Sequence, residues 1–169
     1  MEAELQPAGA VTTAHVITVS DRASAGTMSD ASGPALVQAL KRAGFEVTGP
    51  EVVPDMRERI TGAIVAAASS DVDVVVTTGG TGLGPRDVTP QATASILDFE
   101  VPGIAEEMRR AGAASTPAAA LSRAIAGVRG RTLIVNVPGS VKGATESLGA
   151  VMPLLPHAIQ LLHGDTTHR

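Results

Sequence analysis

The pattern of apolar and polar positions along the chain predicts strands and helices in alternation. Short runs rich in Val and Ile, at residues 15–19, 45–53 and 72–78, are typical of buried strands. The segments between them carry apolar residues at helical spacing; we expect the first helix to end at Gly44 and the second to begin at Pro54-Asp55. Such alternation predicts a parallel sheet with helices on its faces.

The second half of the chain departs from this simple alternation. We expect a loop of small residues at 23–30 and helices at 89–98 (with Thr89 as its N-cap), 102–109, 115–122, 144–152 and 153–163. Residues 124–128 and 132–137 flank Arg129-Gly130-Arg131 as a predicted hairpin. A hairpin adds one antiparallel strand to an otherwise parallel sheet. The predicted fold class is therefore α/β, with a mostly parallel sheet and one antiparallel strand near the C-terminal half.

The length of 169 residues suits one domain, which we assign to residues 13–163, between polar tails at 1–12 and 164–169. A hydrophobic fraction of 44% and a mean hydropathy of +0.21 favour a compact globule. The first ten residues lack the apolar centre of a signal peptide, and no apolar run approaches the roughly 20 residues of a membrane helix. We therefore expect a cytoplasmic protein without a membrane partner.

The composition argues against several functions. Aromatic residues make up 1% of the chain and its net charge is −4, which disfavours stacking on bases or binding to a phosphate backbone. There is no cysteine, which excludes disulfides, thiolate catalysis and Cys-ligated metals. The four histidines lack the spacing of metal ligands, so we expect structural or surface roles for them. An anionic ligand would have to be bound by local donors.

The most distinctive stretch follows the strand predicted at residues 72–78. It contains four glycines in six residues, then an Arg86-Asp87 pair, then a Thr-Pro that can open a helix. Glycines allow backbone N–H groups to face a ligand without a Cβ in the way, and anions bind where such donors meet a helix N-terminus. The alternative is a strand-to-helix turn without a ligand. The glycine cluster and the charged pair favour an anion site.

Two other predicted strands end in polar loops, and parallel strands would bring all three loops to one end of the sheet. The loops offer hydroxyls, carboxylates and amides, from Ser20, Asp21, residues 79–82, Asp87, Ser140 and Lys142. Amides and hydroxyls suit phosphates, and carboxylates suit Mg²⁺. Lys142 fits equally well as a solvated loop lysine. Asp55, followed by Glu58, resembles a capping box and therefore a helix N-cap.

Several familiar motifs are absent, among them the Walker A loop, a Gly-x-Gly-x-x-Gly after the first strand and a Gly-x-Ser-x-Gly elbow. Phosphoryl or nucleotidyl transfer fits the remaining residues, because it needs positioning and charge neutralisation more than a protein base. An attacking group that is itself an ionised phosphate needs no general base.

Five segments carry a family resemblance: Val16-Ile-Thr-Val-Ser-Asp-Arg22, Thr77-Thr-Gly-Gly-Thr-Gly82 with Arg86-Asp87-Val-Thr89, Pro102-Gly-Ile-Ala-Glu106, Leu121-Ser-Arg123 and Asn136-Val-Pro-Gly-Ser140. In this order, over about residues 12–163, they resemble the molybdenum-cofactor biosynthesis proteins of the molybdopterin adenylyltransferase type. The resemblance implies a three-layer α/β/α sandwich that assembles as a trimer or hexamer. It also implies that the terminal phosphate of molybdopterin attacks the α-phosphate of Mg²⁺-bound ATP, giving adenylyl-molybdopterin and pyrophosphate.

The resemblance also implies roles for individual residues. Asp87 matches the family's acid after the glycine loop, with a catalytic and Mg²⁺-binding role, and Asp55 matches its second functional aspartate; the capping interpretation of Asp55 stays open beside it. The residues expected to bind substrate are Ser20, Asp21, Gly79, Gly80, Thr81, Gly82, Ser140 and Lys142. Val141 departs from the proline often found after Pro-Gly-x in the family. A pterin-binding or regulatory paralogue without activity is one alternative, and a nucleotide pyrophosphatase is another.

Overall fold

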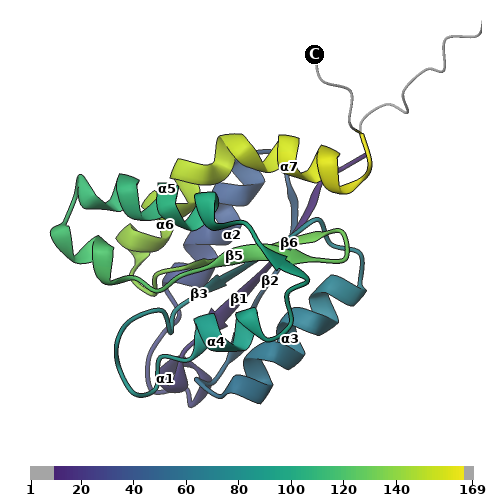
Figure 1. Ribbon diagram of the computed structural model, residues 1–169. Coiled ribbons are helices and arrows are strands. Elements are labelled where there is room, and N and C mark those ends of the chain that lie inside the picture. The colour runs from purple at the N-terminus through teal and green to yellow at the C-terminus, as the bar shows by residue number, and fades with distance from the viewer. Residues whose placement is uncertain (1–9, 166–169) are drawn as a thin grey trace, which may run out of the picture.

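The computed structural model describes residues 10–165 and is organised around one six-stranded sheet (Figure 1). The strand order is β2-β1-β3-β6-β5-β4. The strands are β1 (Thr13–Val19), β2 (Glu46–Val53), β3 (Val74–Thr78), β4 (Phe99–Glu100), β5 (Ala126–Arg129) and β6 (Thr132–Val137). Strands β2, β1, β3 and β6 pair in parallel, whereas β5 runs antiparallel to both β6 and β4. The predicted parallel sheet with one reversed strand is confirmed.

Helices cover both faces of the sheet, so the molecule has three layers (Figure 1). The helices are α1 (Asp21–Ser24), α2 (Ser32–Arg42), α3 (Arg57–Ser69), α4 (Thr89–Ala94), α5 (Pro102–Ala113), α6 (Val141–Val151) and α7 (Leu155–Leu162), with 3₁₀ turns η1 (Pro117–Leu121) and η2 (Met152–Leu154). Helices α2, α5, α6 and α7 pack on one face, and α3 and α4 on the other. None of the helices among residues 10–165 combines the length and apolar character needed to cross a bilayer.

Two apolar cores lie on opposite sides of the sheet because successive residues of a strand face opposite ways. In β3, Val74 and Val76 belong to the core under α2, α5, α6 and α7, whereas Val75 packs with α3 and α4. All five residues of β3 are buried, which explains why the sequence of this strand is an unbroken run and not an alternating one.

Several predicted boundaries were wrong. The first two residues of the expected loop at 23–30 belong to α1 (Asp21–Ser24), since the Ser20 hydroxyl accepts the Ala23 N–H and caps a short helix. Helix α4 ends at Ala94 and not near residue 98, because the chain turns into β4. Helix α6 begins at Val141, three residues early, because Ser140 is its N-cap. The predicted tails, 1–12 and 164–169, lie largely outside the described residues.

Asn136 links four elements at the end of the sheet where the predicted site loops begin. Its side chain is fully buried, and its Nδ2 donates to Thr77 Oγ1 on β3 and to Thr93 Oγ1 on α4, each at 2.9 Å. Its Oδ1 accepts the N–H of Ile125, just before β5, at 3.3 Å. Both ends of the amide are therefore satisfied, which is what burial of a polar group requires.

Replacing Asn136 with alanine is expected to lower the free energy of unfolding by about 2 kcal/mol, because it leaves a buried N–H group and two buried hydroxyls without partners. Urea unfolding followed by circular dichroism measures this loss. Thr145→Ala, which removes an exposed hydroxyl bonded to the carbonyls of its own helix, is the control and should change stability by less than about 0.5 kcal/mol. An equal effect of both substitutions would contradict the assigned role of Asn136.

Candidate functional site

Four chain segments predicted to bind a ligand meet at one edge of the sheet. Strands β1, β2, β3 and β6 are parallel, so the loops that follow them leave from the same end. These loops carry Ser20 and Asp21, Asp55, the glycine loop at residues 79–87, and Ser140. Open parallel sheets bind ligands at this end, so the fold supports the predicted placement of the site.

Two pockets lie at this edge and share one wall, formed by Gly80, Asp87, Gly139 and Ser140. The larger, of about 610 Å³, is the acidic pocket, whose charged lining consists of four carboxylates and one guanidinium: Asp21, Asp30, Asp55, Asp87 and Arg22. The smaller, of about 450 Å³, is the small-residue pocket, enclosed by α5, η1 and α6 and lined mainly by Ala, Gly and Ser. Ligands in the two pockets would meet at the shared wall.

The glycine loop requires glycine at its first two positions. Gly79 and Gly80 have φ angles of 101° and 69°, in the left-handed region that side chains disfavour. A Cβ on Gly79 would collide with the carbonyl oxygen of Val19, and a Cβ on Gly80 with the hydroxyl of Thr89. The loop therefore lies directly against the end of β1 and the start of α4.

Three amides of this loop are available to a ligand. The Gly79 N–H donates to Val137 O at 3.1 Å, and the Gly84 N–H to Asp87 Oδ2 at 2.9 Å. The amides of Gly80, Thr81 and Gly82 donate to no other group among residues 10–165. Adjacent unpaired N–H groups of this kind form an anion-binding concavity, and all three residues line a pocket.

Arg123 and Thr89 fix the glycine loop in place by donating hydrogen bonds to its backbone carbonyl groups. Arg123 donates from Nε to Gly82 O at 2.8 Å and from Nη2 to Asp87 O at 2.7 Å, and its own N–H reaches Thr81 O at 2.9 Å. Thr89 Oγ1 donates to Gly79 O at 2.9 Å. Thr89 is thus the first residue of α4 and not its N-cap, which corrects the sequence prediction.

Sequence reasoning gave neither Arg123 nor Thr89 a role in the site. The one available signal for Arg123 was its place in the Leu121-Ser-Arg123 segment of the family resemblance. Its partners lie 36 and 41 residues away along the chain, so local pattern could not show the contact.

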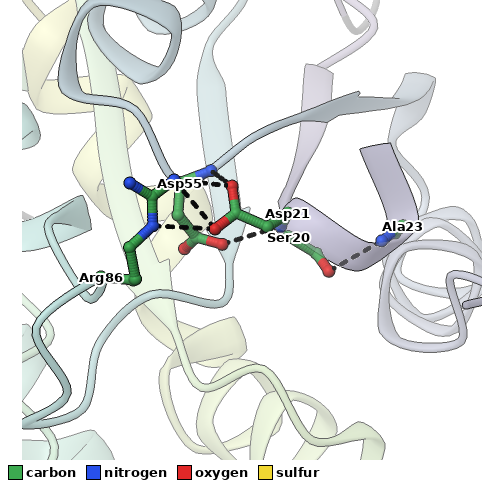
Figure 2. A network of polar contacts seen from close by, with 5 residues as sticks. All are labelled: Ser20, Asp21, Ala23, Asp55 and Arg86. Atoms are coloured by element: carbon green, nitrogen blue, oxygen red, sulfur yellow. Dashed lines mark hydrogen bonds and ion pairs between the residues drawn. The ribbon is translucent and has the colours of Figure 1, made fainter. Parts of the chain in front are cut away.

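Asp21 and Asp55 bind each other's backbone (Figure 2). The Asp21 N–H donates to Asp55 Oδ2 at 2.8 Å, and the Asp55 N–H to Asp21 Oδ1 at 3.0 Å. The capping prediction for Asp55 and Glu58 is wrong: α3 begins at Arg57, its N-cap is Met56, and no side chain caps it. The Asp55 carboxylate accepts the N–H of Asp21, which is distant along the chain, and does not cap the helix that follows it.

Arg86 completes this network with a two-pronged contact on Asp21. Its Nε donates to Asp21 Oδ2 at 2.9 Å and its Nη2 to Asp21 Oδ1 at 3.0 Å (Figure 2). These hydrogen bonds hold the pKa of Asp21 below its ordinary value. The pKa of Asp55 is raised instead, first by burial and then by the charges of Asp21 and Asp87. A cation near Asp55 would relieve that repulsion.

The remaining predicted residues fall into two groups. Ser20 Oγ and Ser140 Oγ cap α1 and α6 by accepting N–H groups, each at 3.1 Å, and each hydroxyl keeps its own proton for a ligand. Lys142 is not brought to the lining of either pocket; its Nζ lies 3.9 Å from Glu146 Oε1, and its side chain is 76% exposed.

The carboxylates suit a Mg²⁺ ion that is shared with a ligand. Within the described part of the chain, no group of three or more His, Asp or Glu side chains could enclose a metal alone. Mg²⁺ is usually bound by one or two carboxylates together with substrate phosphates. Asp55 and Asp87 line the same pocket, and the charge of Asp87 acts on Asp55.

The comparison with known families decides where this chain belongs. A family described as "Probable molybdopterin binding domain" matches residues 15–157. This chain belongs to that family. The assignment confirms the resemblance inferred from the five sequence segments.

Relatives of this molybdopterin-binding family differ widely in length. The chain is 38% identical over 156 residues to molybdopterin adenylyltransferase from Helicobacter pylori (strain J99), covering 89% of this chain and 87% of the relative. It is 42% identical over 158 residues to gephyrin from Dictyostelium discoideum, covering 88% of this chain but only 22% of gephyrin. The crystal structure of the molybdopterin biosynthesis enzyme MoaB from Thermus thermophilus is 50% identical, with a TM-score of 0.85, covering 91% and 98% of the two chains.

Arg123→Met is expected to loosen the glycine loop, because it removes both hydrogen bonds from the guanidinium to Gly82 O and Asp87 O. The hydrogen-bonded amides of this loop, those of Gly79, Gly84 and Asp87, should exchange about tenfold faster or more, since hydrogen bonds to charged groups contribute roughly 1.5–3 kcal/mol. Hydrogen–deuterium exchange read by mass spectrometry measures this. Arg131→Met, at an exposed turn position, is the matched control, and equal exchange in both variants would contradict the bracing role.

Asp55→Asn is expected to raise the melting temperature at pH 7. The raised pKa means that the folded protein holds the Asp55 proton more tightly than the unfolded chain does. The bound proton therefore stabilises the folded state fully below the ordinary aspartate pKa. This stabilisation is lost as pH rises through the raised pKa. Asparagine keeps an acceptor for the Asp21 N–H and lacks the charge. The advantage of the variant should shrink at about pH 3, where the wild-type carboxyl is protonated.

Calorimetry at the two pH values tests this expectation. Glu107→Gln is the opposite control, because Arg110 lowers the pKa of Glu107 by hydrogen bonding, so this variant should melt lower than wild type at pH 7. A lower melting temperature for Asp55→Asn at pH 7 would contradict the raised pKa.

Proposed function

We propose that this protein acts in molybdenum cofactor biosynthesis by adenylylating molybdopterin. The terminal phosphate of molybdopterin would attack the α-phosphate of ATP, giving adenylyl-molybdopterin and pyrophosphate. The observation that carries the proposal is the shared wall of Gly80, Asp87, Gly139 and Ser140, at which ligands in two pockets can meet. The name of the Helicobacter relative, molybdopterin adenylyltransferase, supports the same activity.

The chain's own residues would act by binding and orienting phosphates. The free amides of Gly80, Thr81 and Gly82 suit phosphate oxygens, and Gly79 supplies the backbone turn that presents them. The hydroxyls of Ser20 and Ser140 can each donate a further hydrogen bond. The Asp21 carboxylate holds the backbone of Asp55 in place. Lys142 would contact the phosphates only if its ion pair with Glu146 broke.

The reaction would need no general base, because an ionised phosphate is already a nucleophile. No histidine lines either pocket among residues 10–165, and the acidic pocket is lined by carboxylates instead. Asp55 and Asp87 would hold Mg²⁺, which neutralises phosphate charge during nucleotidyl transfer. Catalysis by positioning and charge neutralisation fits this set of residues.

We further propose that residues 13–163 form a single molybdopterin-binding domain of a cytoplasmic homo-oligomer, a trimer or hexamer. Size-exclusion chromatography with light scattering measures the assembly state.

The proposed activity is tested by mixing the protein with molybdopterin, ATP and Mg²⁺ and detecting the adenylylated product by mass spectrometry. Tight binding of molybdopterin without product would instead indicate a binding or regulatory paralogue. Release of AMP from a dinucleotide without pterin would indicate a nucleotide pyrophosphatase.

Asp87→Asn is expected to lower turnover by about 100-fold or more, because charge stabilisation at a transferring phosphoryl group contributes on that scale. Circular dichroism should show an unchanged fold. Asp98→Asn removes one charge beside the β5–β6 turn, where Asp98 Oδ2 accepts the Gly130 N–H, and should retain wild-type turnover. Full activity of Asp87→Asn would remove Asp87 from the proposed mechanism.

A further inference from the structure

The acidic pocket has the wrong charge for a polyphosphate. Four carboxylates line it against one guanidinium, that of Arg22. One Mg²⁺ ion offsets only part of this excess, and the net charge of the chain, −4, does not attract an anion either. A polyphosphate bound here needs a further cation from outside the lining.

Arg86 is the cation placed to supply that charge. It lies one residue before Asp87 in the glycine loop and is not part of the acidic pocket's lining. Its guanidinium is hydrogen-bonded to Asp21, which is part of that lining (Figure 2). The side chain of Arg86 is 63% exposed and that of Asp21 41% exposed. Exposed ion pairs are weak and exchange readily. The guanidinium fork that fits a carboxylate also fits a phosphate.

Asp21 would keep its position without Arg86. Its Oδ1 also accepts the Asp55 N–H, and its own N–H donates to Asp55 Oδ2. These two bonds join the loops after β1 and β2 independently of the arginine. Departure of Arg86 would therefore uncover a fixed carboxylate beside Asp55 without loosening the site.

We propose that Arg86 is a pyrophosphate-binding residue that stays paired with Asp21 until the ligand binds. When the polyphosphate end of a nucleoside triphosphate enters the acidic pocket, the guanidinium moves from the Asp21 carboxylate to the β- and γ-phosphates. The uncovered Asp21 then joins Asp55 in facing the cation that accompanies the phosphates. The naming of the nucleotide rests on the proposed function, whereas the exchange itself requires only a pyrophosphate group.

Isothermal titration with inorganic pyrophosphate and with AMP, without molybdopterin, tests this exchange. Arg86→Gln should lose about tenfold or more in affinity for pyrophosphate, the scale of a charge-assisted hydrogen bond, while its affinity for AMP stays within about twofold. Arg110→Gln is the matched control: it breaks a similar exposed fork, to Glu107, and neither of these two residues lines either pocket. It should bind both ligands like wild type.

A double-mutant cycle separates exchange from simple charge removal. In EDTA, Asp21→Asn should bind pyrophosphate more tightly than wild type because it frees Arg86, and this gain should vanish in the Arg86→Gln background. An equal gain in both backgrounds would overturn the proposal, because it would reflect only the lost negative charge. Equal loss of AMP and pyrophosphate binding in Arg86→Gln would overturn it too.

The test is independent of turnover. If the cycle shows coupling but no adenylylated product forms, the proposed function fails and the role of Arg86 stands. If product forms and Arg86→Gln binds pyrophosphate like wild type, the role of Arg86 fails and the proposed function stands.

Discussion

The whole site depends on how closely the backbone at Gly79 approaches the end of β1. The left-handed turn there leaves no room for a Cβ beside the Val19 carbonyl, so the loop after β3 lies directly on the loop after β1. The Gly79 carbonyl and N–H are bonded to Thr89 and Val137 respectively, which ties the same residue to α4 and β6. One small residue thus sets the spacing between three of the loops that form the pockets.

Buried hydrogen bonds at the ends of the central strands keep this arrangement rigid. Thr78 Oγ1 donates to Pro138 O at 2.8 Å and also lies 3.0 Å from Ser32 Oγ, while Asn136 joins Thr77 on β3 to Thr93 on α4. Among the described residues, no buried side-chain nitrogen or oxygen lacks a partner. A fully satisfied polar layer of this kind specifies one geometry, because any shift would leave a buried group unpaired.

The sequence predicted the fold better than the site's internal contacts, for a physical reason. The strands and their faces follow from local apolar spacing, and the glycine loop from its composition. The role of Asp55 could not be read locally, since its carboxylate bonds to Asp21, 34 residues earlier, in preference to the helix that follows it. Arg86 and Arg123 likewise act across 65 and 41 residues, and propensity carries no information at such distances. Short-range capping rules failed at Asp55 and Thr89, where tertiary partners compete for the same side chains.

The shared wall between the pockets has a consequence for whatever leaves the site. A molecule that covalently joins the occupants of the acidic and small-residue pockets would contact both linings at once. When one half dissociates, the other half keeps it at a high effective concentration beside its empty pocket, so rebinding competes with escape. Two ligands that arrive separately can be exchanged one at a time, but their joined product must release both halves together. In the proposed transfer, the geometry that lets the two reactants meet would therefore also slow the departure of the product.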